Sequence, residues 1–171
     1  MNRIHITGAT GFLGSFLLKS LMSKYIITCS SYSKKLNEIK KIDHINFDLA
    51  NKENIPDTFL DDTDIVIHCA GAAHKKKFQS KNMSDSFKRN NENATRNVID
   101  FVIRKSVKKF IYISSLSVYN TNNFNVKINK FSKCDPSNDY GVSKLAAETF
   151  IKSTCDRNKI DYIIIRPALI L

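Results

Sequence analysis

The sequence predicts an α/β fold in which helices cover both faces of a doubly wound parallel sheet. Short β-branched apolar runs alternate with longer helix-like stretches, which implies βαβ crossovers. The apolar runs are continuous, as in strands buried on both faces. A glycine-rich turn separates the first run from the first helix-like stretch. We therefore expect one Rossmann-like domain spanning residues 1–171.

Each expected strand is a short apolar run rich in Ile, Val, Tyr or Phe. The runs fall at residues 4–7, 25–29, 45–47, 65–68, 110–113 and 160–166, and Pro167 ends the last one. Helices are expected at residues 12–23, 84–105 and 140–158. The middle helix is indicated by apolar residues that share one side of it, namely Phe87, Ala94, Val98, Phe101 and Val102. The polar residues 120–136 are expected to form a loop.

The formal net charge is +11, from 27 Lys and Arg against 16 Asp and Glu. The lysines are scattered, and we find no basic stripe with interleaved aromatic residues, so we expect no nucleic-acid binding. Part of the excess charge would still attract a phosphorylated substrate. The chain has no apolar run long enough to cross a bilayer and no signal-peptide pattern, so a cytoplasmic location is expected.

The cysteines are Cys29, Cys69, Cys134 and Cys155, and their spacing is not that of a metal site. We expect neither a zinc site nor a disulfide framework. Cys29 and Cys69 lie in apolar runs and are interpreted as buried small hydrophobic residues.

The glycine-rich turn contains Gly8, Gly11 and Gly14, between a predicted strand and a predicted helix. Glycines let the backbone approach a ligand closely, and a helix N-terminus offers unpaired N–H groups, so the turn predicts a pyrophosphate site. The alternative is a tight turn that only packs the helix on the strand. Thr7 and Thr10 would add hydroxyl contacts or cap the helix.

The end of the second strand would select the cofactor. An acidic residue there usually binds the ribose of NAD, but this chain has Ser30, Ser31, Tyr32, Ser33, Lys34 and Lys35. This cluster of hydroxyls and lysines favours NADP over NAD. The alternative is that the lysines begin a solvated helix. Asp48, after the third strand, would either accept the amino group of adenine or cap the next helix.

Small residues follow the fourth strand, at Ala70, Gly71 and Ala72, and would let a cofactor lie against the carboxyl edge of the sheet. We interpret His68 as a packed strand histidine with no catalytic role. Ser115, at the end of the fifth strand, would donate to a substrate oxygen or only make hydrogen bonds at the strand end.

Tyr140 and Lys144 are four residues apart and share a helix face. A phenol has an unperturbed pKa of about 10, and a lysine ammonium one turn away is expected to lower it. Tyr140 would then exchange a proton with an alcohol or ketone while hydride moves at the adjacent carbon. A Tyr–Lys spacing is common by chance, so this interpretation depends on the glycine turn occurring in the same chain.

Together these residues resemble the extended short-chain dehydrogenase/reductase family of NAD(P)-dependent nucleotide-sugar epimerases, dehydratases and reductases. The matching segments follow the family's order, at residues 7–14, 48–49, 68–72, 90–95, 114–119, 140–144 and 166–167. The resemblance implies the strand order 3-2-1-4-5-6. It also implies that the Gly8, Gly11, Phe12 and Leu13 segment holds the pyrophosphate and that Asp48 and Leu49 border adenine.

The resemblance assigns further roles around the reacting carbon. Ala70, Gly71 and Ala72 would line the inner ribose of the cofactor, and Pro167 would lie near the nicotinamide. Asn91 would support the active site, Ser115 would polarise the substrate oxygen, and Tyr140 would be the acid/base. Lys144 would also bind the nicotinamide ribose.

The implied function is oxidation or reduction of a nucleoside-diphosphate sugar at a secondary alcohol or ketone, the step shared by epimerisation and ketone reduction. Residues 71–74 are similar to those of bacterial polysaccharide-biosynthesis enzymes. Family members continue well past the Arg166-Pro167 motif, whereas this chain ends at Leu171, so the substrate domain is expected to be largely missing. The alternative function is a catalytically silent NAD(P)-binding module. A homodimer through residues 84–105 and 140–158 is expected by analogy.

Overall fold

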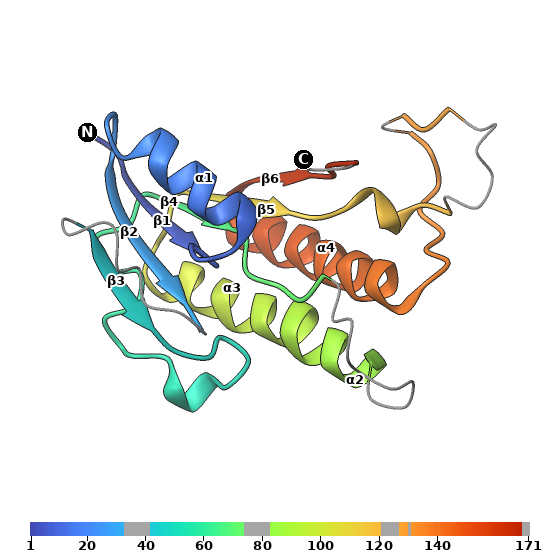
Figure 1. Cartoon of the computed structure of the whole chain (residues 1–171), viewed down its shortest axis with the longest axis horizontal. Helices are drawn as coiled ribbons and strands as arrows, with labels where there is room; N and C mark the ends of the chain where they lie inside the picture. The colour runs from blue at the N-terminus through green and yellow to red at the C-terminus, as the bar shows by residue number, and fades with distance from the viewer. Residues whose placement is uncertain (33–41, 74–82, 121–126, 130, 169–171) are drawn as a thin grey trace.

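A computed structural model describes residues 1–32, 42–73, 83–120, 127–129 and 131–168. It contains a six-stranded sheet in which all neighbouring strands are parallel, in the order β3-β2-β1-β4-β5-β6 (Figure 1). The strands are β1 Arg3–Thr7, β2 Ile26–Ser31, β3 Asp43–Asn46, β4 Ile65–His68, β5 Lys109–Ile113 and β6 Asp161–Ile165. The predicted doubly wound sheet and its strand order are confirmed.

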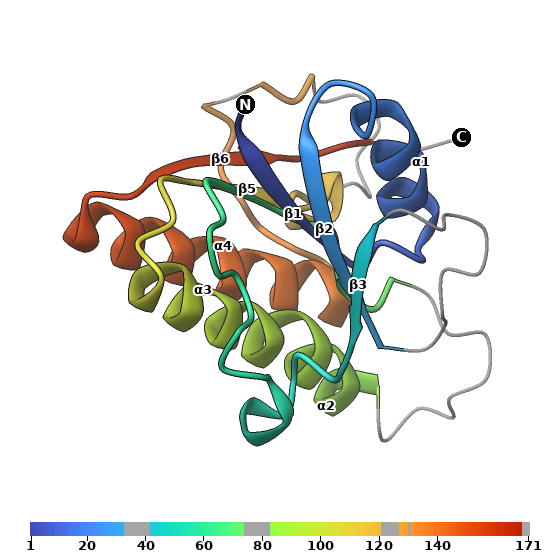
Figure 2. The same cartoon turned by 90° about the vertical axis from the view of Figure 1, so that its left-hand side faces the viewer.

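Helices lie on both faces of the sheet. Helix α1 (Phe12–Leu21) lies on one side, while α3 (Ala94–Arg104) and α4 (Asp139–Asn158) pack side by side on the other (Figures 1 and 2). The predicted helix over residues 84–105 is a continuous run of α2 (Met83–Phe87), a π-helical stretch (Lys88–Asn93) and α3. Two short 3₁₀ turns, Lys52–Asn54 and Leu116–Val118, lie in the connections.

The core has one part on each face of the sheet. On the α1 side, Leu18 packs with Ile6 and Cys29. On the other side, the fully buried Phe59 makes edge-to-face ring contacts with Phe47 and Phe101 at centroid distances of 5.0 and 5.2 Å. Burying an apolar side chain of this size contributes about 2–3 kcal/mol.

Two buried histidines join neighbouring strands. His68 forms a hydrogen bond between Nδ1 and Thr7 Oγ1 at 2.6 Å and another between Nε2 and Thr95 Oγ1 at 3.0 Å. His5 contacts Thr28 Oγ1 at 2.8 Å through Nδ1. Burial lowers the pKa of both rings to about 3, so both are neutral at physiological pH. The interpretation of His68 as a packed strand histidine is confirmed.

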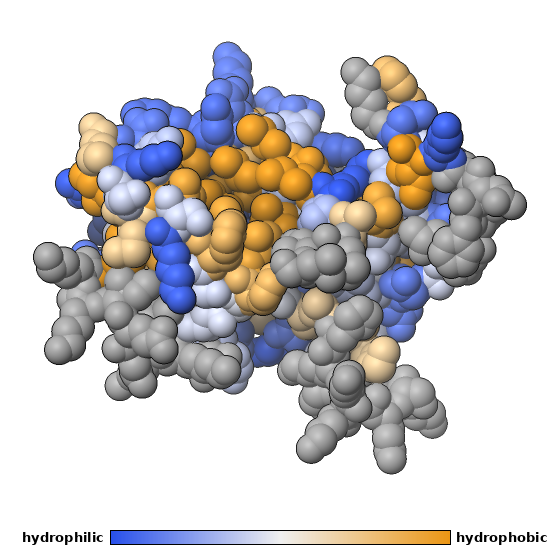
Figure 3. Space-filling model, turned by 45° about the horizontal axis from the view of Figure 1, so that its top comes forward, coloured by the Kyte–Doolittle hydropathy of each residue, from blue (hydrophilic) through white to orange (hydrophobic). Residues whose placement is uncertain are grey.

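The sheet face on the α1 side leaves apolar residues exposed beside α1. Ile163 and Ile165 of β6 are 46% and 44% exposed, and Phe16 of α1 is 65% exposed. Figure 3 shows the apolar surface on this side of the molecule. Parallel sheets are normally covered on both faces, so this surface is unusual for the fold. Among the residues that the structure describes, no helix has both the length and the apolarity needed to cross a bilayer.

Candidate active site

The glycine turn connects β1 to α1 and packs against the loop after β4. Gly8 has φ +68°, and a Cβ there would lie 2.7 Å from Ala70 Cα, while a Cβ on Gly14 would lie 2.2 Å from the Gly8 carbonyl oxygen. These two glycines are therefore required for packing. Gly11 precedes α1 with an extended backbone and gives the helix no side-chain cap. The turn therefore packs the helix tightly, as the alternative predicts, and also leaves the N-terminus of α1 without a side-chain cap.

A first cavity of about 400 Å³ opens beside this turn. It is lined by Gly8, Thr10 and Gly11 of the turn, and by Asp48 and Leu49 after β3. Ala70, Gly71 and Ala72, after β4, complete the predicted set. The structure therefore brings together the residues that the sequence assigned to pyrophosphate, adenine and inner ribose, with Phe12 and Leu13 as the exceptions.

The Phe12 side chain does not reach the predicted pyrophosphate site. It is the first residue of α1, it is 68% exposed, and it lines neither the first cavity nor the second. The expected part of Phe12 in holding the pyrophosphate would therefore belong to its backbone and stays a prediction. Leu13 lines the second cavity, next to Tyr140 rather than beside Asp48.

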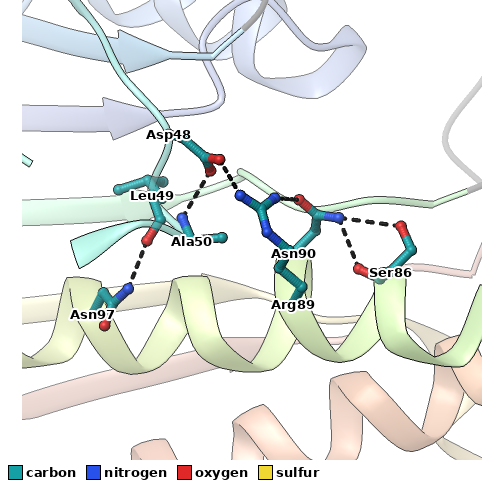
Figure 4. Close-up of polar contacts among 7 residues, drawn as sticks. All are labelled: Asp48, Leu49, Ala50, Ser86, Arg89, Asn90 and Asn97. Atoms are coloured by element: carbon teal, nitrogen blue, oxygen red, sulfur yellow. Dashed lines mark hydrogen bonds and ion pairs between the residues drawn. The ribbon is translucent and has the colours of Figure 1, made fainter. Parts of the chain in front are cut away.

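Asp48 is held on both of its carboxylate oxygens. Oδ1 accepts a hydrogen bond from the Ala50 backbone amide at 2.9 Å, and Oδ2 forms an ion pair with Arg89 (Figure 4). The carbonyl of Leu49 accepts from Asn97 Nδ2 at 2.9 Å. Asp48 thus organises the turn that follows it and also lines the cavity. Sequence reasoning missed Arg89, because its partner is 41 residues away in the chain.

The second cavity, of about 280 Å³, adjoins the first, because Cys69, Gly71 and Ala72 line both. Its walls carry Ser115, Tyr140, Lys144 and Pro167, which were all predicted near the reacting carbon. The two cavities follow the carboxyl edge of the sheet, where the strand order reverses between β1 and β4. Ligands of doubly wound folds bind in the crevice at this point.

Lys144 is buried in the floor of the second cavity. Its Nζ donates to the Ile113 carbonyl at 2.9 Å and lies 4.8 Å from the centroid of the Tyr112 ring. Burial lowers the pKa of Lys144 to about 8, with the nearby Cys69 and Glu148 acting in the opposite direction. A Cβ on Gly71 would lie 3.4 Å from Nζ, so this glycine keeps space open beside the ammonium group.

The pKa of Tyr140 is raised in this structure, chiefly by burial, while a hydrogen bond with Ser115 lowers it. The Tyr140 ring lies 5.6 Å from the ring of Phe87, which contributes to that burial. The sequence predicted that Lys144 would lower this pKa. That prediction is wrong here, because desolvation of the phenol outweighs the effects that favour its ionised form.

Asn91 supports the site without lining either cavity. It is 1% exposed, its Oδ1 accepts from the Ala72 amide at 2.7 Å, and its Nδ2 donates to the Ala72 carbonyl at 3.1 Å and to Ser143 Oγ at 2.9 Å. Asn91 therefore links the loop after β4 to α4, a place that agrees with the supporting role implied by the resemblance. It lies in the π-helical stretch, a feature frequent at functional sites.

The structure confirms the predicted burial of one cysteine but not of the other. Cys29 is buried as expected, but Cys69 is only partly buried and lies where the two cavities meet; burial raises the pKa of its thiol to about 12. All four cysteines are free.

Ser33, Lys34, Lys35 and His74 lie outside the described residues. Ser114 Oγ is buried and has no hydrogen-bond partner within the described part of the chain.

Comparison with known proteins identifies a family and close structural neighbours. The model of the NAD dependent epimerase/dehydratase family matches residues 4–171. A UDP-glucose 4-epimerase of Vibrio cholerae is 30% identical over 172 residues, covering 98% of this chain and 51% of that protein. A dTDP-D-glucose 4,6-dehydratase of Dictyostelium discoideum is 30% identical, covering 97% and 43%. This chain spans about half the length of the curated relatives it matches.

Solved structures have the same fold. A UDP-N-acetylglucosamine 4-epimerase from Methanobrevibacter ruminantium M1, in complex with UDP-N-acetylmuramic acid, superposes with a TM-score of 0.83 at 25% identity, covering 96% of this chain and 54% of that one. A UDP-glucuronic acid 4-epimerase from Bacillus cereus, in complex with NAD, also has a TM-score of 0.83, at 24% identity, covering 97% and 56%. At 24% identity, the similarity to the Bacillus cereus enzyme is evidence for the fold only.

Proposed function

The chain belongs to the NAD dependent epimerase/dehydratase family, and on that premise we propose that it binds NAD along the carboxyl edge of its sheet. In the whole protein, this site would oxidise or reduce a nucleotide-sugar at a secondary alcohol or ketone. One observation carries the proposal: two adjoining cavities place an open helix N-terminus at one end and Tyr140 with Lys144 at the other.

The described residues fit a dinucleotide. A Cβ on Gly11 would lie 3.2 Å from the Gly8 carbonyl oxygen, so a side chain there would crowd the turn that lines the first cavity. Gly71 has the same effect in the middle of the crevice, where a Cβ would lie 2.9 Å from Asn91 Oδ1. The uncapped N-terminus of α1 offers N–H groups and a positive dipole end to a pyrophosphate.

We propose NAD rather than NADP as the cofactor. The family is NAD dependent, and a neighbouring structure contains NAD. The preference for NADP rested on the hydroxyl and lysine cluster at residues 30–35, and the relatives give it no support. Ser31 and Tyr32 of this cluster line the first cavity, whereas Ser33, Lys34 and Lys35 lie outside the described residues.

The chain's own residues would handle the proton. When bound, the nicotinamide supplies hydride transfer. Tyr140 would pass the proton to or from the substrate oxygen, and the Ser115 hydroxyl, already hydrogen-bonded to Tyr140, would hold the same oxygen. Lys144 uses one N–H on Ile113 O and has further N–H groups for ribose hydroxyls.

A UDP- or dTDP-sugar is the substrate class we propose, because the relatives are named for such sugars. A homodimer through residues 84–105 and 140–158 also remains a proposal, which sedimentation would check. The second candidate function is a catalytically silent NAD-binding module.

Calorimetric NAD binding and a turnover assay on several UDP- and dTDP-sugars, run on one sample, test the proposal. We expect NAD binding in the wild type and in Tyr140→Phe, and turnover only in the wild type. Binding without turnover in either protein would favour the silent module. Absence of NAD binding would refute both functions. Mass analysis of the denatured protein would identify any dinucleotide that copurifies.

A further inference from the structure

Arg89 joins two residues that line the first cavity, although it is not itself a lining residue. Asp48, after β3, and Asn90, in the π-helical stretch, both line that cavity. The Arg89 guanidinium forms an ion pair with Asp48 through Nη2 and donates to Asn90 Oδ1 through Nη1 at 3.2 Å (Figure 4). Arg89 therefore spans from the helix to the loop after β3, in contact with two residues of the cavity wall.

Both partners of Arg89 are themselves fixed. Asp48 Oδ1 accepts from the Ala50 amide at 2.9 Å. Asn90 Nδ2 donates to the carbonyl and the hydroxyl of Ser86 at 2.8 and 3.2 Å, so the orientation of its amide is determined. The guanidinium is thus held at two of its nitrogens by groups that cannot easily turn away.

This arrangement leaves the flat faces of the guanidinium available. Hydrogen bonds to a guanidinium lie in its plane, and its faces stack on aromatic rings. The Arg89 side chain is 49% exposed, which leaves area for such a contact. The cavity beside it is walled by apolar groups of Phe47, Leu49 and Ala50, an environment suited to a flat heteroaromatic base.

We propose that Arg89 is a specificity-determining residue for the adenine base of the dinucleotide, with its guanidinium face packed against the ring. This inference rests on the proposed function and adds a binding residue that belongs to none of the sequence motifs. Asp48 lines the same cavity, and its carboxylate has further lone pairs that can accept a hydrogen bond from the amino group of the base.

A purely structural role for Arg89 makes a different prediction. If Arg89 only tied the loop after β3 to the helix, a lysine, which can pair with Asp48 through one ammonium group, would replace it. A lysine has no planar face, so it cannot replace a stacked guanidinium. Arg89→Lys and Arg89→Met together therefore distinguish the two roles.

Dissociation constants for NAD, ADP and nicotinamide mononucleotide test the proposal on the wild type, Arg89→Lys and Arg89→Met. We expect both variants to weaken NAD and ADP binding about tenfold, the scale of one lost stacking contact with a base, and to leave the mononucleotide unaffected. Arg104→Met is the matched control, since Arg104 is 53% exposed and pairs with Asp57 away from both cavities.

Wild-type affinity for ADP in Arg89→Lys would overturn the stacking role, and so would an equal loss of all three ligands. ADP binding without NAD binding in the wild type would refute the proposed function while leaving the Arg89 comparison valid. A wild type that binds neither ADP nor NAD would overturn both proposals. Unfolding temperatures of the variants would identify any loss of affinity that reflects misfolding.

Discussion

Arg166 and Glu148 form a buried ion pair that ties the end of β6 to α4. Arg166 Nε donates to Glu148 Oε1 at 2.9 Å, and Nη2 pairs with Oε2. Glu148 is fully buried, and Arg166 also donates to the Tyr119 hydroxyl. The pKa of Arg166 is raised, chiefly by its hydrogen bonds to Glu148. The pair fixes β6, and with it Pro167, beside the second cavity.

Removing one partner of this pair should destabilise the fold strongly. We expect Glu148→Gln to lower the free energy of unfolding by about 3 kcal/mol, because it leaves Arg166 without a counter-charge. Urea unfolding measures the change. Glu92→Gln is the control: Glu92 pairs with the more exposed Arg96, and a surface pair of this kind contributes below about 1 kcal/mol. Equal effects of the two substitutions would contradict a special role for the buried pair.

Asn91 should matter for stability as well as for binding. Asn91→Ala leaves both backbone groups of Ala72 without their partner, and each unpaired buried group costs about 1–3 kcal/mol. We expect a loss of about 3 kcal/mol and weaker NAD binding, measured by denaturant unfolding and calorimetry. Asn97→Ala, which removes a single bond to Leu49 O, should cost about 1 kcal/mol. A smaller effect at Asn91 than at Asn97 would show that the loop after β4 does not depend on this bracing.

The glycines of the turn should divide into two classes. Gly8→Ala places a Cβ against Ala70 in a left-handed backbone, so we expect it to cost at least about 2 kcal/mol of stability. Gly11→Ala has an ordinary φ of −74°, so its main effect should be on NAD affinity. Thermal unfolding and NAD titration of both variants provide the comparison. A stable Gly8→Ala variant would contradict the close packing of the turn.

The burial of Lys144 should produce a pH dependence of stability. Its pKa falls from 10.5 to about 8 on folding, so between these values the unfolded state binds more protons than the folded state. Stability contributed at this site therefore rises as pH increases from about 8 towards 10, by up to roughly 3 kcal/mol. The free energy of unfolding of the wild type should therefore rise relative to that of Lys144→Met over this pH range. Lys24→Met, at an exposed position, should give a flat difference, and a flat difference for Lys144→Met would contradict its burial as a cation.

Much of the fold could be predicted because its signals are local. Strands such as Ile65–His68 are apolar runs whose residues face helices on both sides of the sheet. The glycine turn is recognised by three glycines spaced three residues apart between a strand and a helix. The predicted bounds of the third strand were wrong. Strand β3 spans Asp43–Asn46 rather than residues 45–47, since a weak apolar run does not set where pairing with β2 begins.

The residues of the candidate site could be predicted only where a position in a sequence motif implies a position in the fold. Ser115, Tyr140, Lys144 and Pro167 were assigned to one place by resemblance, and they do line one cavity. Phe12 was assigned to the pyrophosphate by its position in the turn alone, whereas the direction of its side chain depends on where α1 begins. Arg89 was missed because an arginine on a helix gives no sign of a distant carboxylate.

The sequence by itself determined the parallel sheet and its glycine turn, because strand and helix periodicity and the steric demands of glycine act over a few residues. The full set of residues at the carboxyl edge was assigned by the resemblance to a family. Only the tertiary structure decided the charge states and partners. Tyr140 has a raised pKa and Lys144 a lowered one because both are desolvated by segments far away in the chain. Burial and long-range contacts depend on how the layers close around a group, and no short stretch of sequence contains that information.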